Sequence, residues 1–211
     1  MQNTEKIVEI DHPIIARDLT ILRNKSTTTD VFRLALGRIS TILAYHALMN
    51  IPMKEIPVET PIQMTTGYKI DAEIVVIPIL RAGLGLVDAI TNFIPDARVG
   101  HLGMYRDEVT KKPVDYYVNI PNGIENALVL VVDPMLATGG SACDAIGFLK
   151  SQGAKNIRFT CLISAPEGLA KLQEEHPDVS IITAAIDEKL NENKFIVPGL
   201  GDAGDRIFGT T

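Results

Sequence analysis

The amino-acid sequence predicts an α/β fold in which a mostly parallel sheet is flanked by helices. From residue 73 onward, short β-branched segments alternate with segments whose apolar residues recur at helical spacing. The chain has 211 residues and is 46% hydrophobic, which is enough to bury a sizeable core. Polar residues stand directly after two of the strand-like segments, where an open parallel sheet binds its ligands.

Residues 1–50 are predicted to be helical. Phe32, Leu36, Ile39 and Leu43 are spaced by four, three and four positions, and this spacing puts them on one face of a helix. The Thr-Thr-Thr-Asp sequence before them suits a helix start. We expect these helices to cover the sheet or another subunit.

Strands and helices then alternate along the middle of the chain. Strands are predicted for residues 73–80, 128–133, 157–163 and 179–186, and helices for residues 86–94, 141–151 and 167–175. This order implies a parallel sheet that is covered on both faces. Arg81 follows the first strand and Asp133 ends the second, so both are expected at the carboxyl edge of the sheet.

Two segments interrupt this alternation. Residues 99–121 carry two half-polar arms around a charged centre, which predicts a flap hairpin that projects from the sheet. Residues 187–211 are rich in glycine yet apolar, and we expect this C-terminal hood segment to be ordered and to offer main-chain groups to a ligand. The sequence has no repeat and no linker, so residues 1–211 are expected to form a single domain.

Composition excludes several classes of protein. The net charge is −6 and no basic residues cluster, which argues against general nucleic-acid binding. No apolar run is long enough for a membrane span, and the N-terminus lacks the order of a signal peptide, so a cytoplasmic location is expected. Cys143 and Cys161 have no metal-site spacing and are expected to be buried, reduced thiols.

The segment VLVVDPMLATGGSACDAI predicts an anion site. Its buried strand ends at Asp133, and Thr138, Gly139, Gly140 and Ser141 then supply backbone N–H groups and hydroxyls before a helix begins. A phosphorylated sugar would offer a phosphate to the loop and hydroxyls to the acid. No lysine follows Gly140 and no Gly-x-Gly opens the turn, which excludes a P-loop and a dinucleotide fingerprint. Taken alone, the segment fits equally well a tight turn in which Asp133 is a cap.

Four sequence blocks occur in a characteristic order: RAGLGLVDA, MYRDEVTKKP, VVDPMLATGGS and FIVPGLGDAGDRIFGT. Together they resemble the uracil phosphoribosyltransferases, within the type I phosphoribosyltransferases, and the resemblance extends over nearly the whole chain. It implies the type I phosphoribosyltransferase fold and a pentosyltransferase of pyrimidine salvage. Such an enzyme transfers the phosphoribosyl group of 5-phosphoribosyl 1-diphosphate (PRPP) to N1 of uracil. UMP and diphosphate are the products, and Mg²⁺ is the implied cofactor.

The resemblance also implies roles for residues at matching positions. Arg81 would hold the diphosphate, Arg106 would close over it from the flap, and Asp202 would lie near PRPP or its Mg²⁺; these three are the expected catalytic residues. The PRPP loop would comprise Asp133, Pro134, Met135, Leu136, Ala137, Thr138, Gly139, Gly140 and Ser141, with the 5′-phosphate on the last five and the ribose hydroxyls at Asp133. Uracil would contact Ile196, Gly201, Asp202 and Ala203 in the hood.

Three positions depart from the pattern of many relatives. Pro134 takes the place of a second acid at the strand end, as is usual in the uracil subfamily, which favours Asp202 or water as the missing ligand. Phe195 stands where many members have tyrosine, and Lys194 stands where glycine is common. No role of the tyrosine hydroxyl is therefore carried over to this chain.

Two alternative functions are considered, and the resemblance implies two further partners. One alternative is a PRPP-fold regulator that binds the RNA of pyrimidine operons. The acidic net charge and the uracil-type hood disfavour it. The other alternative is a transferase for another base, but the hood has the wrong length and composition for that. The family further implies a homo-oligomer, a dimer or tetramer, and GTP as an effector. Arg23 and Lys25 are the first candidates for GTP binding. No nucleic-acid or membrane partner is expected, and Asp205 is expected to be a turn residue.

Overall fold

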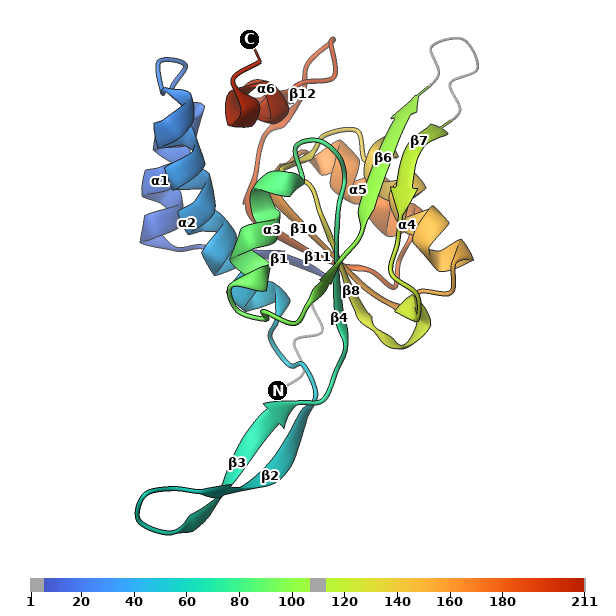
Figure 1. Cartoon of the computed structure of the whole chain (residues 1–211). Helices are drawn as coiled ribbons and strands as arrows, with labels where there is room; N and C mark the ends of the chain where they lie inside the picture. Colours follow the sequence, from blue (N-terminus) through green and yellow to red (C-terminus); the bar gives the residue numbers. More distant parts are fainter. Residues whose placement is uncertain (1–5, 107–112, 211) are drawn as a thin grey trace.

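The computed structural model describes residues 6–106 and 113–210, and the side chains of residues 104–106 and 113–116 lie outside that description. Figure 1 shows a central sheet with helices on both faces, a hairpin that rises at one end and another that extends from the opposite end. The predicted α/β architecture with a parallel sheet is confirmed.

The central sheet has seven strands, and every pairing in it is parallel. The order is β1-β11-β10-β8-β4-β5, and β9 pairs with β10. The strands are β1 (Ile7–Glu9), β4 (Ile74–Pro78), β5 (Arg98–Val99), β8 (Leu128–Val132), β9 (Met135–Leu136), β10 (Asn156–Ser164) and β11 (Ser180–Ile186). The four predicted strands are confirmed, whereas the three shortest were not predicted because so few residues carry no periodic signal.

Two layers of helices sandwich this sheet. One layer contains α1 (Pro13–Arg23), α2 (Thr29–Ala47) and α3 (Leu84–Thr91), and the other contains α4 (Gly140–Ser151) and α5 (Pro166–Glu175) (Figure 1). Val76 and Leu130 belong to the core under the first layer, while their neighbours Val75 and Val129 belong to the core under the second. Because both faces are covered, these central strands read as continuous apolar runs rather than as alternating ones.

The N-terminal prediction is correct for two helices and wrong for one short segment. The four residues Phe32, Leu36, Ile39 and Leu43 are all buried on α2, which begins at the predicted threonine run. Ile7–Glu9 is not helical but forms β1, which pairs with β11 at the edge of the sheet. That pairing depends on residues far along the chain, so local sequence gives no sign of it.

Among the described residues, three antiparallel pairs lie outside the sheet. The flap prediction is confirmed by β6 (His101–Arg106) and β7 (Pro113–Asn119), although its tip lies outside the described residues. The hairpin of β2 (Met53–Glu59) and β3 (Met64–Ile70) occupies a region that the sequence left unassigned. The hood contains β12 (Lys189–Leu190), β13 (Ile196–Val197) and α6 (Ala203–Phe208), and η1 (Ile124–Asn126) precedes β8.

Figure 1 shows that α6, β12 and the flap stand at the same end of the sheet, while β2 and β3 extend from the other end. The strand directions make the first of these ends the carboxyl edge, where ligands bind in open parallel sheets. None of the helices in the described part of the chain has both the length and the hydropathy that crossing a membrane requires.

Candidate active site

The turn after β4 is the first part of the site. The N–H of Ile79 donates to the carbonyl oxygen of Val132 (3.0 Å), which joins the ends of β4 and β8. Gly83 packs against this junction: a Cβ there would overlap the Val132 oxygen and come within 2.7 Å of backbone atoms of Ile79. Only glycine fits so close an approach of backbones. The turn therefore holds Arg81 at the carboxyl edge, beside the residue that follows β8.

The loop between β8 and α4 is the second part. A Cβ on Gly168 of α5 would lie 2.5 Å from the carbonyl oxygen of Ala137, so the loop is pressed against the start of that helix. Gly139, with φ +76°, precedes the first turn of α4. Thr138 and Ser141 remain exposed. Thr138 Oγ1 accepts from the N–H of Gly140 (3.4 Å), so an exposed hydroxyl lies beside the first turn of α4, where an anion can bind.

Asp133 lies where β8 ends, and it is partly buried. Its N–H donates to the carbonyl oxygen of Thr160 (3.1 Å), which fixes it to β10. Burial raises the pKa of its carboxyl to about 7, the N–H of Met135 opposes this rise, and the negative charge of Asp202 adds to it. Gly83 packs against Val132, the residue before Asp133, and Ala82 packs against Gly204, two residues after Asp202, so the acid of the loop and the acid of the hood lie at the same edge.

The hood follows a path that requires glycine. Gly199 and Gly201 have φ values of +64° and +80°, in the left-handed region that favours glycine. A Cβ on Gly199 would overlap the carbonyl oxygen of Ile196. Ile196 is only 4% exposed and belongs to the core, so packing fixes its place in the hood. Lys194 also has a positive φ, +66°, a conformation that glycine adopts without strain.

The short helix α6 packs over the turn after β4. Asp202 caps it, since its Oδ1 accepts from the N–H of Asp205 (3.0 Å). A Cβ on Gly204 would lie in van der Waals contact with Ala82, 3.8 Å away. Asp205 is not a simple turn residue, as the sequence suggested, because its Oδ1 lies 3.4 Å from Arg81 Nη2. This exposed, long ion pair contributes little stability and leaves the guanidinium able to bind an anion.

The structure thus brings three of the predicted site segments together: the Arg81 turn, the loop at residues 133–141 and the hood. The flap is connected to them at its base, where Ile79 and Leu102 form an isolated parallel bridge. Arg106 ends β6, and its side chain lies outside the described residues. Its predicted role stays a prediction.

Sequence reasoning missed the residues that hold the hood in position. Arg206 donates to the carbonyl oxygens of Leu22, Leu200 and Asn24, the last two at 2.8 Å, and its guanidinium stacks over a ring of α2. Asp187 and Arg23 form a second connection, to Gly199. One signal for Asp187 was present, because it directly follows β11 at the same carboxyl edge as Asp133.

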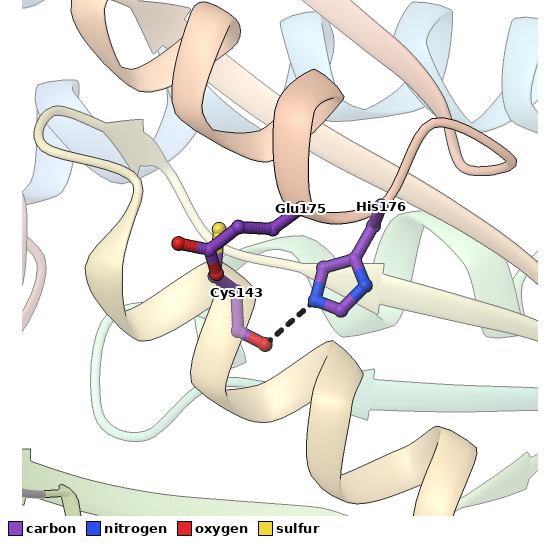
Figure 2. Close-up of side chains that lie close together, drawn as sticks. All are labelled: Cys143, Glu175 and His176. Carbon is purple, nitrogen blue, oxygen red and sulfur yellow. Dashed lines mark hydrogen bonds between the residues drawn. The ribbon is translucent and has the colours of Figure 1, made fainter.

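A trio of Cys143, Glu175 and His176 joins α4 to the end of α5 (Figure 2). Within the described residues it is the one such trio with ligand atoms close enough to suggest a metal site. Each member already has a protein partner: His176 Nε2 donates to the carbonyl oxygen of Cys143 (3.0 Å), and Glu175 pairs with Lys171. Burial and the Glu175 charge raise the pKa of the Cys143 thiol to about 12. We interpret the trio as a structural connection between the two helices. Cys143 and Cys161 are free and buried, as predicted.

Comparison with known proteins is consistent with this geometry. A family model described as uracil phosphoribosyltransferase matches residues 8–210. The chain is 56% identical to the uracil phosphoribosyltransferase of Salinibacter ruber over 206 residues, which covers 98% of each protein. It is 53% identical to the enzyme of the same name from Lactiplantibacillus plantarum, over 97% of this chain and 99% of that protein.

Solved structures resemble the fold as well. The AQ2163 protein of Aquifex aeolicus superimposes with a TM-score of 0.90 at 35% identity, over 97% of this chain and 99% of that one. A hypoxanthine phosphoribosyltransferase of Trypanosoma cruzi, at 14% identity over 77% of this chain and 76% of that one, has a TM-score of 0.50 and shares the fold alone.

Proposed function

The chain belongs to the uracil phosphoribosyltransferase family, a family of pentosyltransferases in pyrimidine salvage, and from this premise we propose how its residues transfer the phosphoribosyl group. In the reaction the bond from C1 of the ribose to the diphosphate oxygen breaks, the bond from C1 to uracil N1 forms, and N1 loses its proton. The observation that carries the proposal is the convergence of Arg81, Asp133 and Asp202 at one edge of the sheet.

PRPP is proposed to lie along the loop of residues 133–141. The exposed hydroxyls of Thr138 and Ser141, together with the first amides of α4, would hold the 5′-phosphate. The carboxylate of Asp133 would accept hydrogen bonds from the ribose hydroxyls. The exposed guanidinium of Arg81 would bind the diphosphate by charge-assisted hydrogen bonds.

Uracil is proposed to bind the hood through main-chain groups of Ile196, Gly201, Asp202 and Ala203. The ring presents an acceptor, a donor and an acceptor at O2, N3 and O4, and a fixed backbone can offer the complement. Cytosine carries an amine donor where uracil has O4, so the same backbone would mismatch it. The buried side chain of Ile196 and the positive φ of Gly201 support a rigid main-chain contact.

The residues fit a magnesium ion that arrives with PRPP. Two carboxylates, Asp133 and Asp202, lie near enough for one charge to raise the pKa of the other, and such a pair favours a cation between it and a phosphate. Asp202 would hold the ion through water. When bound, Mg²⁺ would neutralise charge that develops on the departing diphosphate. Asp202 is exposed and is also the proposed acceptor of the N1 proton.

Arg106 is proposed to complete the site from the flap. Closure of β6 and β7 would bring its charge to the diphosphate and exclude water from the reactive sugar. Arg106→Ala should lower turnover by well over tenfold with an unchanged thermal midpoint, because leaving-group charge then lacks one donor. Steady-state kinetics beside a thermal melt test this. Kinetics close to those of the wild type would remove Arg106 from the mechanism.

The test of the function itself is a coupled assay of diphosphate release. PRPP and Mg²⁺ would be supplied with uracil, cytosine, hypoxanthine, guanine or orotate in turn. We expect release with uracil and less than about one-hundredth of that rate with cytosine. Equal rates with a second base would reject the proposed recognition by the hood.

We propose that the enzyme is a homo-oligomer whose subunits meet at the β2–β3 hairpin. An isolated two-stranded hairpin is marginally stable in water. Here Ile62, Met64 and Tyr68 are 90%, 59% and 64% exposed, and a second copy of the chain would cover them. Ile62→Asp together with Tyr68→Ser should lower the mass measured by light scattering, while a wild-type mass equal to one chain would reject the proposal. The buried free cysteines fit the proposed cytoplasmic location.

GTP is a proposed effector at a cavity between the hood and the start of α2. The cavity has a volume of about 340 Å³ and is lined by Arg23, Lys25 and two threonines on one side and by residues 198–201 and Arg206 of the hood on the other. Three cations suit a polyphosphate. Activity with and without GTP tests the idea: activation of the wild type should weaken at least severalfold in Lys25→Ala. The absence of any GTP effect on the wild type would reject it.

A further inference from the structure

We propose that Asp187 and Arg23 are positioning residues that set the affinity for uracil by fixing the hood at Gly199. Neither residue belongs to the proposed contacts with uracil or PRPP. The inference rests on the proposed binding of uracil by the hood. Asp187 and Arg23 are the side chains that would orient the hood for this binding.

The carboxylate of Asp187 is the centre of the arrangement. Asp187 follows β11, is 6% exposed, and its own N–H donates to the carbonyl oxygen of Ser164 (2.8 Å). Arg23, the last residue of α1, donates to both carboxylate oxygens, with Nη2 2.6 Å from Oδ1 and Nη1 2.8 Å from Oδ2. Such a two-pronged pair fixes direction as well as distance.

The same two side chains hold both polar groups of one hood residue. The N–H of Gly199 donates to Asp187 Oδ2 (2.8 Å), and the carbonyl oxygen of Gly199 accepts from Arg23 Nη1 (3.0 Å). Gly199 is buried and turns back on Ile196 with a positive φ. Its peptide groups are therefore held from two sides by charged side chains that are themselves paired.

Because of where Gly199 lies in the hood, this clamp of Asp187 and Arg23 affects how the hood binds uracil. Gly199 lies between Ile196 and Gly201, so it separates the two stretches of main chain proposed to contact uracil. A small rotation at Gly199 would move one stretch relative to the other, and hydrogen bonds to a planar base tolerate little displacement. The PRPP loop, by contrast, is held by β10 and α5, so a change in the clamp should leave it in place.

The chain offers a matched control in α1. Asp18 is also a buried carboxylate, 0% exposed; it accepts from Nε and Nη2 of its neighbour Arg17 and from the same two atoms of Arg38, with which it forms a long-range pair. This pair joins α1 to α2 rather than to the hood. Asp18→Asn therefore reproduces the loss of a buried Asp–Arg pair without disturbing Gly199.

The experiment compares steady-state kinetics of Asp187→Asn and Asp18→Asn with thermal melts of both. Asp187→Asn keeps the shape of the side chain but replaces one acceptor oxygen with an amide N–H₂ group, which faces N–H donors. KM for uracil should therefore rise about tenfold or more while KM for PRPP stays within about threefold. Asp18→Asn should lower the thermal midpoint and leave the ratio of the two KM values unchanged. Equal rises in both KM values, or no rise, in folded Asp187→Asn would overturn the proposal.

Two further variants keep the test decisive. Arg23→Lys retains the charge but cannot bridge Asp187 and Gly199 with one planar group, so it should raise KM for uracil selectively even if Asp187→Asn does not fold. Gly201→Ala strains the left-handed main chain of a proposed uracil contact directly. If it leaves KM for uracil unchanged, the proposed base site is wrong; if it raises KM while folded Asp187→Asn and Arg23→Lys do not, only the clamp is refuted.

Discussion

Asp133 allows the electrostatics of the site to be tested by protein stability alone. Burial raises the pKa of its carboxyl from 3.8 to about 7 in the folded chain. Between these two pH values the folded state keeps a proton that the unfolded state releases. Stability contributed by that proton is complete below pH 3.8 and is lost as the pH rises to about 7. The ionised carboxylate thus destabilises the folded chain when no substrate is present.

The size of the effect follows from the two pKa values. Each pH unit within the window costs about 1.4 kcal/mol, so the whole interval from 3.8 to about 7 corresponds to about 4 kcal/mol. Asparagine does not titrate. The free energy of unfolding of Asp133→Asn, relative to the wild type, should therefore increase by about 3 kcal/mol between about pH 5 and about pH 8.

Urea unfolding of both proteins at about pH 5 and about pH 8, with a chelator and without PRPP, measures this difference. Asp88→Asn, at an exposed position of α3, is the control for the loss of a carboxylate outside the site. The same Asp133→Asn protein should have a higher KM for PRPP, because the ribose hydroxyls lose a charged acceptor. If the difference in unfolding free energy between Asp133→Asn and the wild type stays constant over this pH range, the charge of Asp133 is not buried in the folded chain.

Three other predictions concern the frame of the site. Gly83→Ala should lower the free energy of unfolding by about 1–3 kcal/mol, since its Cβ would meet backbone atoms that cannot move independently; urea titration measures it, and an unchanged midpoint would contradict the packing. The thiols of Cys143 and Cys161, whose pKa values burial raises to about 12, should not react with an aromatic disulfide at about pH 8 until urea is added. Reaction of either thiol in the native enzyme would show an open core. Lys194→Gly should raise the free energy of unfolding by about 1 kcal/mol, because the left-handed φ of +66° then carries no penalty; a lower thermal midpoint would count against that account.

Sequence alone predicted the parts of this protein whose chemistry is local. The runs at β4 and β8 are apolar because both faces are covered, and the residues that follow them, Arg81 and Asp133, lie at the edge that the strand direction dictates. Of the small residues from Thr138 to Ser141, the first two precede α4 and the last two begin it. A contiguous stretch that binds a phosphate must carry its amides and hydroxyls within a few positions, so its pattern is visible without a structure.

The rest could not be predicted because it depends on partners far apart in the sequence. Arg23 and Asp187 are separated by 164 positions, and Arg206 finds its acceptors near Leu22 across 184. A charged side chain at a helix end or after a strand is most often solvated. Only the packed structure shows that Arg23, Asp187 and Arg206 are instead paired with distant groups. For Asp187 the rule that identified Asp133 predicts only its place, since both follow parallel strands and therefore lie at the same edge. The bonds of Asp187 to Arg23 and to Gly199 are not given by that rule, because they depend on how α1 and the hood pack against the end of β11.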